Sequence, residues 1–482
     1  MKCTTILALS ASLIQSSVEA INLRKRTDDG AVPRVLGLPT QRKAVANPHK
    51  RDQIRRRATA SAILDNEETL YFVNATLGTP PQSLRLHLDT GSSDLWVNTP
   101  SSALCRQTSS PCAFAGTYTA NSSSSYGYVG SWFNISYVDG SGAIGDYVTD
   151  TTSIGGTTLS NFQFGIGYTS SSAQGILGVG YTANEVQVGR AGMSPYDNLP
   201  AKMKAEGKIS SNAYSLWLND LDASTGQILF GGVDTDQFTG QLQTLPIQAD
   251  GGGTYAEFLI TLTGVSFNRE IIASDEALAV LLDSGSSLTY LPNDMVETLY
   301  DRVSAQYDSN EGAAYIACSM AGSNATLEFA FSSPVVISVE MNELVLELVT
   351  ASGKRPRFSD GTEACLFGIA PAGSSSMVLG DTFLRSAYVV YDLENNEISI
   401  AQTNFNATTS NVLEIGTGPA AVPSAVRVAN AVAATGLSDS TTIADSVGVH
   451  NHASGRRVDG VALVAAVGTV MAVAFGAGAT IF

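Results

Sequence analysis

The sequence predicts an all-β protein made of two similar lobes, and two observations lead to this prediction. Val, Ile, Tyr, Phe and Thr recur in short runs that Gly, Asn, Asp and Ser interrupt, a pattern typical of short strands joined by turns. A motif of apolar residues followed by Asp, a hydroxyl residue, Gly, Ser and Ser occurs twice, with its aspartates at Asp89 and Asp283. The chain has 482 residues, enough for two lobes with sizeable cores.

Charge is distributed unevenly along the chain. Residues 21–57 contain 11 Lys or Arg against 3 Asp or Glu, whereas residues 58–405 contain 12 against 36. A basic segment therefore precedes a strongly acidic body. The acidic body argues against nucleic acid as a partner, because it would repel phosphate groups. It suits an acidic environment, where protonated carboxyl groups repel one another less.

The first 20 residues have the features of a signal peptide. Lys2 supplies the positive start, residues 6–14 form a short apolar stretch, and Val18-Glu19-Ala20 fits the small-residue rule for cleavage. The alternative is an ordinary buried helix. We expect residues 1–20 to be removed and the chain to enter the secretory pathway.

Residues 21–57 are interpreted as a basic propeptide. Two basic stops, Lys50-Arg51 and Arg55-Arg56-Arg57, suit cleavage by a processing protease and place the mature start near Ala58. A basic propeptide could lie across the acidic body and block a site lined by carboxylates. The alternative is a basic linker that is never cut.

We expect the N-terminal lobe at residues 58–246 and the C-terminal lobe at residues 247–405. The three glycines at 251–253 suit a connection between the lobes. Helices should be few and short, and residues 195–206 and 293–307 are the candidates.

The C-terminal region has the composition of an anchored protein. Residues 406–460 are rich in Ser, Thr and Ala, as in a linker or stalk, and residues 461–482 are apolar, uncharged and without a cationic stop. This arrangement fits a GPI-anchor signal whose tail is removed, with Asn451 as the candidate attachment residue and Ser446 or Ser454 as alternatives. A retained tail helix is the other interpretation. We therefore expect a lipid-anchored protein of the plasma membrane or cell wall, with a freely secreted protein as the alternative.

Modification signals agree with secretion. Candidate N-glycosylation sites occur at five sequons, namely Asn74, Asn121, Asn134, Asn324 and Asn406. Once Cys3 leaves with the signal peptide, four cysteines remain, which favours two disulfides. Three connectivities are possible, and proximity favours Cys105–Cys112 and Cys318–Cys365. No Cys-x-x-Cys occurs and the body has a single histidine, so we expect no zinc site.

The duplicated motif offers one carboxylate from each half of the chain. Two carboxylates within hydrogen-bonding reach cannot both ionise easily, so the pair holds one shared proton. The ionised partner can take a proton from a water molecule that attacks a carbonyl. The protonated partner can donate to the carbonyl oxygen and later to the leaving amine. Thr90 and Ser284 could bond to the opposite loop, and Ser92 and Ser286 to the outer oxygen of each carboxylate.

On these residues, the sequence resembles the pepsin-like aspartic proteases, and within them the fungal secreted candidapepsin and yapsin type. The resemblance covers residues 70–401. Besides the two motifs it rests on the segments 77–82, 176–178, 229–234, 378–380 and 380–385. It implies a bilobal fold of two barrel-like β-lobes, with a cleft that binds an extended peptide or an unfolded protein. It also implies an aspartic endopeptidase active at acid pH and made as a zymogen. We expect a monomer without metal or organic cofactor, because water is the nucleophile.

The resemblance further implies a flap, a hairpin that closes over the cleft. Residues 135–142 match it, and an Asp-Gly pair between alternating residues is itself a hairpin signal. The flap and substrate-binding candidates are Tyr137, Asp139, Gly140 and Ser141. Asp139 could pair with Lys or Arg in the substrate residue before the scissile bond. The alternatives are strand packing for Tyr137 and a turn-forming role for Asp139.

Other functions explain the sequence less well. His87 could serve as the base of a Ser or Cys triad, but it lies among leucines on a predicted strand, where a packed histidine is more common. Trp96 is expected in the core. A glycosidase also uses paired carboxylates, yet does not account for the duplicated Asp-hydroxyl-Gly loops. A surface-binding protein that has lost catalysis is the non-enzymatic alternative, and both aspartates and the flap tyrosine argue against it.

Overall fold

The computed structural model describes residues 33–43, 70–137, 141–223, 225–309, 312–348 and 355–437, all within one compact unit of the chain. Several predicted features lie outside the described residues. These are the signal peptide, both basic stops, the flap tip at 138–140, Asn451 and the tail at 461–482. No helix among the described residues is both long and apolar enough to cross a membrane.

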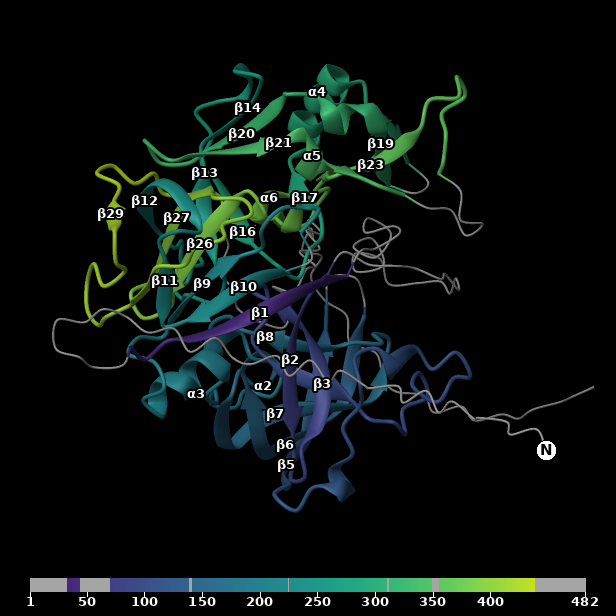
Figure 1. Ribbon diagram of the computed structural model, residues 1–482, viewed down its shortest axis with the longest axis vertical. Coiled ribbons are helices and arrows are strands. Elements are labelled where there is room, and N and C mark those ends of the chain that lie inside the picture. Colours follow the sequence, from purple (N-terminus) through teal and green to yellow (C-terminus); the bar gives the residue numbers. More distant parts are fainter. Residues whose placement is uncertain are drawn as a thin grey trace, which may run out of the picture. The chain divides into compact units, whose positions relative to one another are not determined.

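The N-terminal lobe is a closed barrel of six strands. Successive neighbours hydrogen bond around the ring, and a pairing between its first and last members closes it. The labelled strands of this lobe lie in the lower half of Figure 1. In ring order the strands are β2 (Leu70–Leu77), β3 (Gln82–Asp89), β8 (Gly175–Gly178), β4 (Leu95–Asn98), β7 (Thr157–Ser170) and β6 (Gly142–Ile154). Strand β5 (Gly127–Ser136) pairs with β6 outside the ring. Buried and partly exposed residues alternate along much of β6, as expected for a strand with one face on the core.

The C-terminal lobe is built from three smaller sheets. The first contains β13 (Leu259–Leu262), β16 (Leu278–Leu282), β25 (Met377–Leu379), β17 (Thr289–Leu291) and β24 (Ile369–Pro371). The second contains β15 (Glu270–Ala273), β14 (Gly264–Phe267), β20 (Thr326–Ala330) and β21 (Val336–Glu340). The third contains β18 (Gln306–Asp308), β19 (Ala313–Ala317), β23 (Ala364–Phe367) and β22 (Val345–Leu346).

Strands from both halves of the chain continue the barrel sheet toward the C-terminal lobe. Beyond β2 the order is β1 (Leu36–Lys43), β10 (Thr225–Phe230), β9 (Ala213–Trp217), β26 (Ala387–Asp392), β27 (Glu397–Thr403), β12 (Phe238–Pro246) and β29 (Ala425–Arg427). A two-stranded sheet joins β11 (Gly232–Asp234) to β28 (Val412–Glu414). Because β12 pairs with β27, the chain reaches this shared sheet before the glycines at 251–253.

The internal duplication is visible in the strand pairing around the two motifs. In the first copy β8 runs parallel to β3 and antiparallel to β4, and in the second β25 runs parallel to β16 and antiparallel to β17. A glycine at the end of each crossing strand, Gly178 as the last residue of β8 and Gly380 directly after β25, allows a close approach. A Cβ on Gly178 would lie 2.6 Å from backbone atoms of Ser93, and one on Gly380 would overlap the carbonyl oxygens of Ser286 and Leu288. The motif loops therefore rest directly on the crossing strands.

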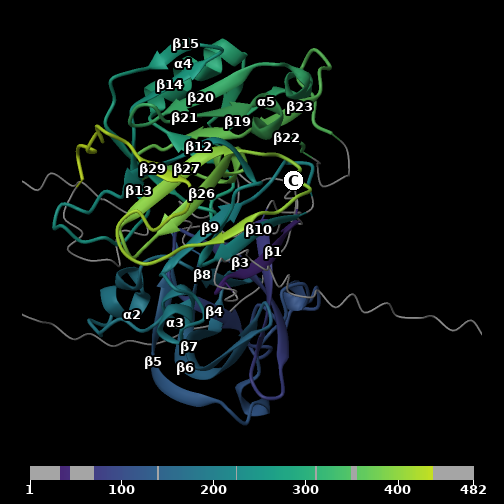
Figure 2. The same ribbon diagram turned by 60° about the vertical axis from the view of Figure 1, so that its left-hand side comes forward.

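Helices in the part of the chain that the structure describes are few and short. They are α2 (Val186–Gly189), α3 (Leu199–Ala205), α4 (Asn293–Val303), α5 (Met341–Leu344) and α6 (Asp381–Leu384), with 3-10 turns at Pro111–Ala113, Ala120–Ser122, Thr182–Asn184 and Cys318–Gly322. Figure 2 shows α2 and α3 beside the barrel, where they contact β5 and β7. Both predicted helices form but are shorter than expected. Helix α4 ends at Val303 because Ser304 adopts a left-handed conformation with φ 55°, and a strand follows.

The region after residue 405 differs from the expected linker. Residues 406–437 pack on the body and supply β28 and β29. Val412, Ile415, Val422 and Val428 are each at least 92% buried. These apolar residues are spaced through a polar sequence, so composition suggested a stalk although each side chain has a place in the core. Only residues 438–460 of the expected linker lie outside the described part.

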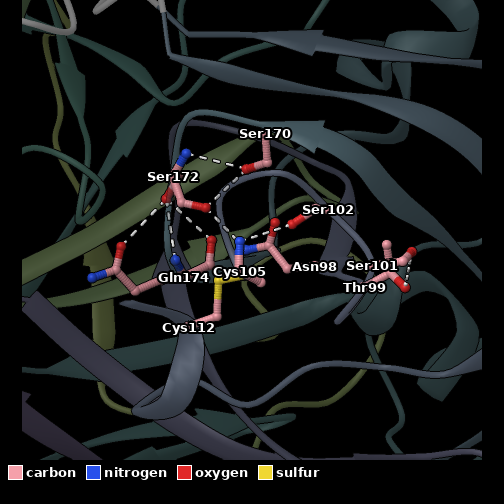
Figure 3. The surroundings of a disulfide bond; sticks show 9 residues. All are labelled: Asn98, Thr99, Ser101, Ser102, Cys105, Cys112, Ser170, Ser172 and Gln174. Atoms are coloured by element: carbon pink, nitrogen blue, oxygen red, sulfur yellow. Dashed lines mark hydrogen bonds between the residues drawn. A yellow bond between two sulfur atoms is a disulfide. The ribbon is translucent and has the colours of Figure 1, made fainter. Parts of the chain in front are cut away.

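The structure contains the two disulfides that sequence proximity favours, Cys105–Cys112 and Cys318–Cys365. Figure 3 shows the first of them with the hydrogen bonds around it. The Cys105 amide donates to Ser102 Oγ at 3.2 Å, and Asn98 Nδ2 donates to the Ser172 carbonyl at 2.9 Å. The second disulfide ties the end of β19 to β23. Each bridge therefore closes a loop within one lobe.

Candidate active site

The two motif aspartates lie at equivalent ends of paired strands. Asp89 is the last residue of β3, and Asp283 directly follows β16. Both are nearly buried, at 4% and 9% exposed. A methyl group on Gly91 would lie 2.5 Å from Asp283 Oδ1, and one on Gly285 would overlap Asp89 Oδ1. Each carboxylate thus lies against the glycine of the opposite loop, and the lobes bring together residues 194 positions apart in sequence.

Hydrogen bonds between the two loops fix this arrangement. Thr90 Oγ1 donates to the Leu282 carbonyl at 2.9 Å, and Ser284 Oγ donates to the Leu88 carbonyl at 3.0 Å. In return, the Thr90 amide donates to Ser284 Oγ at 3.2 Å and the Ser284 amide to Thr90 Oγ1 at 2.9 Å. All four bonds are buried, so the dielectric that strengthens them is low. The two hydroxyl residues therefore hold one loop against the other.

Each carboxylate also receives the same two bonds from its own loop. The Gly91 amide donates to Asp89 Oδ1 at 2.8 Å and Ser92 Oγ to Asp89 Oδ2 at 2.5 Å. In the second copy, the Gly285 amide donates to Asp283 Oδ1 at 2.7 Å and Ser286 Oγ to Asp283 Oδ2 at 2.6 Å. These bonds orient two acidic groups toward each other in a nearly buried setting, where they can exchange a proton with each other or with a bound water.

The hairpin of β5 and β6 contributes Tyr137 next to this centre. Trp96 Nε1 donates to the Tyr137 hydroxyl at 2.6 Å, and the Tyr137 amide donates to the Ser141 carbonyl at 2.8 Å. Tyr137 and Ser92 line one shared hollow, so the tyrosine faces the loop of Asp89. Trp96 is fully buried, as expected. Asp139 and Gly140, the other two tip candidates, lie outside the described residues.

A buried acidic pair beneath the same hollow was not predicted from the sequence. Asp94 accepts hydrogen bonds from the hydroxyls of Tyr147 at 2.5 Å and Tyr196 at 2.9 Å, and from the Val186 amide at 2.9 Å. Glu185, which has no exposed surface, accepts from the Tyr196 amide at 2.8 Å. Asp94 follows the first motif but has no counterpart in the second, where Ser287 is followed directly by Leu288. This extra acidic residue was the feature of the sequence that could have indicated the buried acidic pair.

Burial changes the proton affinity of this pair. Burial raises the pKa of Asp94, although the tyrosine and amide hydrogen bonds oppose the shift. Burial, and then the nearby charge of Asp94, raise the pKa of the Glu185 carboxyl to about 10. Glu185 is therefore protonated across the acidic and neutral range.

A second buried network lies behind the other loop. Arg385 and Glu343 form an ion pair with no exposed surface, and an Arg385 guanidinium NH₂ group donates to the Glu343 carbonyl at 2.5 Å. The Leu221 amide also donates to the Glu343 carboxylate, at 3.1 Å. The sequence singled out the segment of Arg385 but not its partner, because Glu343 is distant in the chain. The pair connects α5 and the segment after α6 to the turn before β10.

The remaining predicted residues lie away from the dyad or in the core. His87 is 2% exposed in β3, with its ring 5.9 Å from that of Phe72, as expected for a packed histidine. The asparagines of all five sequons are exposed. Across the described residues, no group of three or more His, Cys, Asp or Glu side chains is placed to hold a metal ion.

A two-lobed β-fold in which each lobe presents an Asp-hydroxyl-Gly loop to the other defines the class of pepsin-like aspartic proteases. Comparison with protein families agrees with this class, since residues 70–403 match the model described as "Eukaryotic aspartyl protease". The chain belongs to this family and is an aspartic endopeptidase.

Curated relatives carry the same activity in their names. The chain is 55% identical over 440 residues to "Probable aspartic-type endopeptidase opsB" of Aspergillus oryzae, an alignment covering 90% of this chain and 88% of the relative. It is 39% identical over 363 residues to "Candidapepsin-3" of Candida albicans, covering 74% and 85%. The fold resembles the crystal structure of the aspartic proteinase from Irpex lacteus, with a TM-score of 0.59 at 20% identity, covering 78% of this chain and all of that one.

The Glu185 carboxyl predicts how stability depends on pH. Its pKa is raised on folding, so the folded state binds more protons than the unfolded state between about pH 4.5 and pH 10, and stability falls as pH rises through that window. Glu185→Gln should remove up to about 1.4 kcal/mol per pH unit of this decline. Urea unfolding at pH 4, 5.5 and 7 measures the slope. The exposed Glu297→Gln is the matched control, and equal slopes in all three proteins would contradict the assignment.

Proposed function

We propose that this endopeptidase cleaves peptide bonds at acid pH by water attack, with Asp89 and Asp283 sharing one proton. The facing arrangement of the two loops supports this mechanism above all else. Two carboxylates this close cannot both ionise easily, so one acts as base toward water while the other donates to the carbonyl oxygen. The proton taken from the water then passes to the leaving amine, the amide C–N bond breaks, and the proton on the former carbonyl oxygen returns to the pair of carboxylates.

The substrate in this proposal is an extended peptide or an unfolded protein. A peptide backbone in the cleft can form strand-like hydrogen bonds with the flap hairpin, which places its scissile carbonyl over the two loops. Tyr137, held by Trp96, would cover that bond and exclude bulk water. Thr90, Ser284, Ser92 and Ser286 would act as positioning residues, since each binds a loop or a carboxylate.

Replacing either aspartate should abolish hydrolysis. Asp89→Asn and Asp283→Asn each replace one of the two carboxyl groups that share the proton by an amide of nearly the same size. Because the amide can neither act as the base nor donate an acidic proton, kcat on an unfolded protein at pH 4 should fall by at least about a thousandfold. Asp301→Asn, on the exposed face of α4, controls for loss of one charge. Full proteolysis by Asp89→Asn would exclude the dyad. Hydrolysis of a glycan instead of the protein would favour a glycosidase.

The zymogen proposal gains support from strand β1. This strand lies within the expected propeptide, N-terminal to both basic stops, and pairs with β10 over six residues and with β2 over three. The expected propeptide therefore supplies a strand next to β2, which in turn pairs with β3, the strand that ends at Asp89. Cleavage at the basic stops would leave β1 held by non-covalent contacts alone. Acidification would then weaken its attraction to the acidic body as carboxylates become protonated.

Removing the basic stops should block maturation. A variant with Lys50, Arg51, Arg55, Arg56 and Arg57 all changed to Ala should accumulate as a precursor, because a processing protease loses its basic sites. N-terminal sequencing and intact mass of the secreted protein measure this. A mature start near Ala58 in that variant would count against processing at these positions.

A preference for basic residues before the scissile bond is proposed for Asp139. Its carboxylate follows Tyr137 by two residues, close enough in sequence to reach the same stretch of substrate. Asp139→Ala should lower kcat/KM for a Lys peptide about tenfold relative to its Phe counterpart, as measured with paired peptides at pH 5. Unchanged Lys-to-Phe discrimination would leave Asp139 as a turn residue.

Secretion, cell-surface anchoring and glycosylation complete the proposal. The chain is 39% identical to a "Secreted aspartic protease 3" of Candida albicans, which supports the secretory pathway. The exposed sequons are accessible to glycosylation in such a pathway. We also propose a monomer, a signal peptide at residues 1–20 and a GPI anchor at Asn451, which rest on the sequence alone.

A further inference from the structure

A third carboxyl group lies beside the catalytic pair. Strand β13 is antiparallel to β16, with Leu259 opposite Leu281, and the Leu282 amide donates to the Phe258 carbonyl at 3.2 Å. The same register therefore places Phe258 opposite Leu282, and one position further it places Glu257 opposite Asp283. Residues opposite each other in an antiparallel pair present their side chains on the same face. Glu257 therefore shares the face from which Asp283 enters the site.

The N-terminal lobe has no acid at the corresponding place. There Phe72 lies opposite His87 in β2 and β3, so the same register places Leu70 opposite Asp89. Leu70 is only 2% exposed and belongs to the core. Apart from Asp94, which only the first copy contains, the two motif loops reproduce each other's hydrogen bonds to the aspartates. The acidic group thus distinguishes the Asp283 side of the site from the Asp89 side.

Glu257 is held in position, yet it lacks a counter-charge. Its neighbour Phe258 is fully buried against Tyr181 and Tyr391, with ring centroids 5.3 and 4.7 Å away, which fixes the local backbone. Glu257 itself is half-buried. Within the described ranges, no residue donates a hydrogen bond or forms an ion pair with its carboxyl group. A fixed, partly buried carboxyl without a cation is suited to bind one from outside.

The groups that act on Glu257 are themselves acidic. Burial, and then the charges of Asp283 and Asp250, raise its pKa to about 7. Asp250 is held in the adjacent turn by the Thr254 amide at 2.7 Å, and Asp89 faces Asp283 from the other loop. The nearby phenols are Tyr255 in the same segment and Tyr181. Glu257 thus changes charge between weakly acidic and neutral pH.

We propose that Glu257 is a specificity-determining residue that binds a basic substrate side chain next to the scissile bond. This inference rests on the proposed catalytic pair, since Glu257 lies beside it only if substrate binds there. A lysine or arginine would offset the repulsion among Glu257, Asp283 and Asp250 and form a charge-assisted hydrogen bond. Glu257 belongs to the C-terminal lobe, whereas Asp139 belongs to the flap of the N-terminal lobe. The two acids would therefore act on different substrate positions.

The preference should depend on pH in a defined direction. Below its pKa Glu257 is mainly neutral, so a cationic side chain must displace a proton to pair with it. As pH rises toward 7 the carboxyl is already ionised before substrate binds, so no proton has to be displaced. The kcat/KM of the cationic substrate therefore increases relative to that of a neutral one. The ratio of kcat/KM for paired lysine and glutamine peptides should thus increase from pH 4.5 to pH 7.

The test compares peptides that differ only in Lys or Gln at each of the two residues flanking the scissile bond. In the wild-type enzyme one of these positions should show a Lys-to-Gln ratio that rises about tenfold between pH 4.5 and pH 7. Glu257→Gln should make that ratio low and independent of pH. Glu276→Gln is the matched control, because it removes one acid that precedes β16, away from the end of the strand that Asp283 follows. Both peptides are measured on the same enzyme, so partial misfolding cancels in the ratio.

Two outcomes separate this inference from the proposed function. If Asp89→Asn is inactive but Glu257→Gln keeps the wild-type ratio and pH trend at both positions, the role of Glu257 is overturned and the catalytic pair stands. If Asp89→Asn remains active, the catalytic pair itself fails. A ratio that falls equally in Glu257→Gln and Glu276→Gln would reflect net charge and would also overturn the specific role.

Discussion

The reciprocal hydrogen bonds of Thr90 and Ser284 are the constraint on which the site depends. Each hydroxyl accepts from an amide of the opposite loop and donates to a carbonyl at the end of the opposite strand. Because these bonds are buried, losing one partner would leave polar groups unsatisfied on both loops. The carboxylates are oriented by their own loops, but their facing arrangement requires the two lobes to meet at this contact.

The crossing strands explain why the motif loops can be so close. Gly178 and Gly380 allow β8 and β25 to pass directly beneath the two loops, where any side chain would collide with backbone. The loops are thus supported from below by strands and from the side by each other. This double support places the proposed catalytic pair on rigid elements although it is assembled from distant parts of the chain.

The duplication is close in the loops and incomplete around them, and the differences concern acidic groups. The first copy adds Asp94, which pairs through tyrosines with the segment of Glu185. The second adds Glu257 across from Asp283. Both glutamates have raised pKa values because Glu185 is buried, Glu257 is partly buried, and other acids lie near each of them. These protonated groups fit a protein that is strongly acidic overall and is proposed to work at low pH.

The sequence by itself determined the all-β class, the two lobes and the paired motifs, because these follow from local patterns and from one repeat, and it favoured, without determining, the two disulfides that form. It left open which residues surround the motifs. The partners Glu343 of Arg385 and Glu185 of the Asp94 network are distant in the chain, and residues 406–437 have a linker's composition although they pack on the body. Only tertiary structure decides such contacts, since burial and pairing depend on which surfaces meet and not on neighbouring residues.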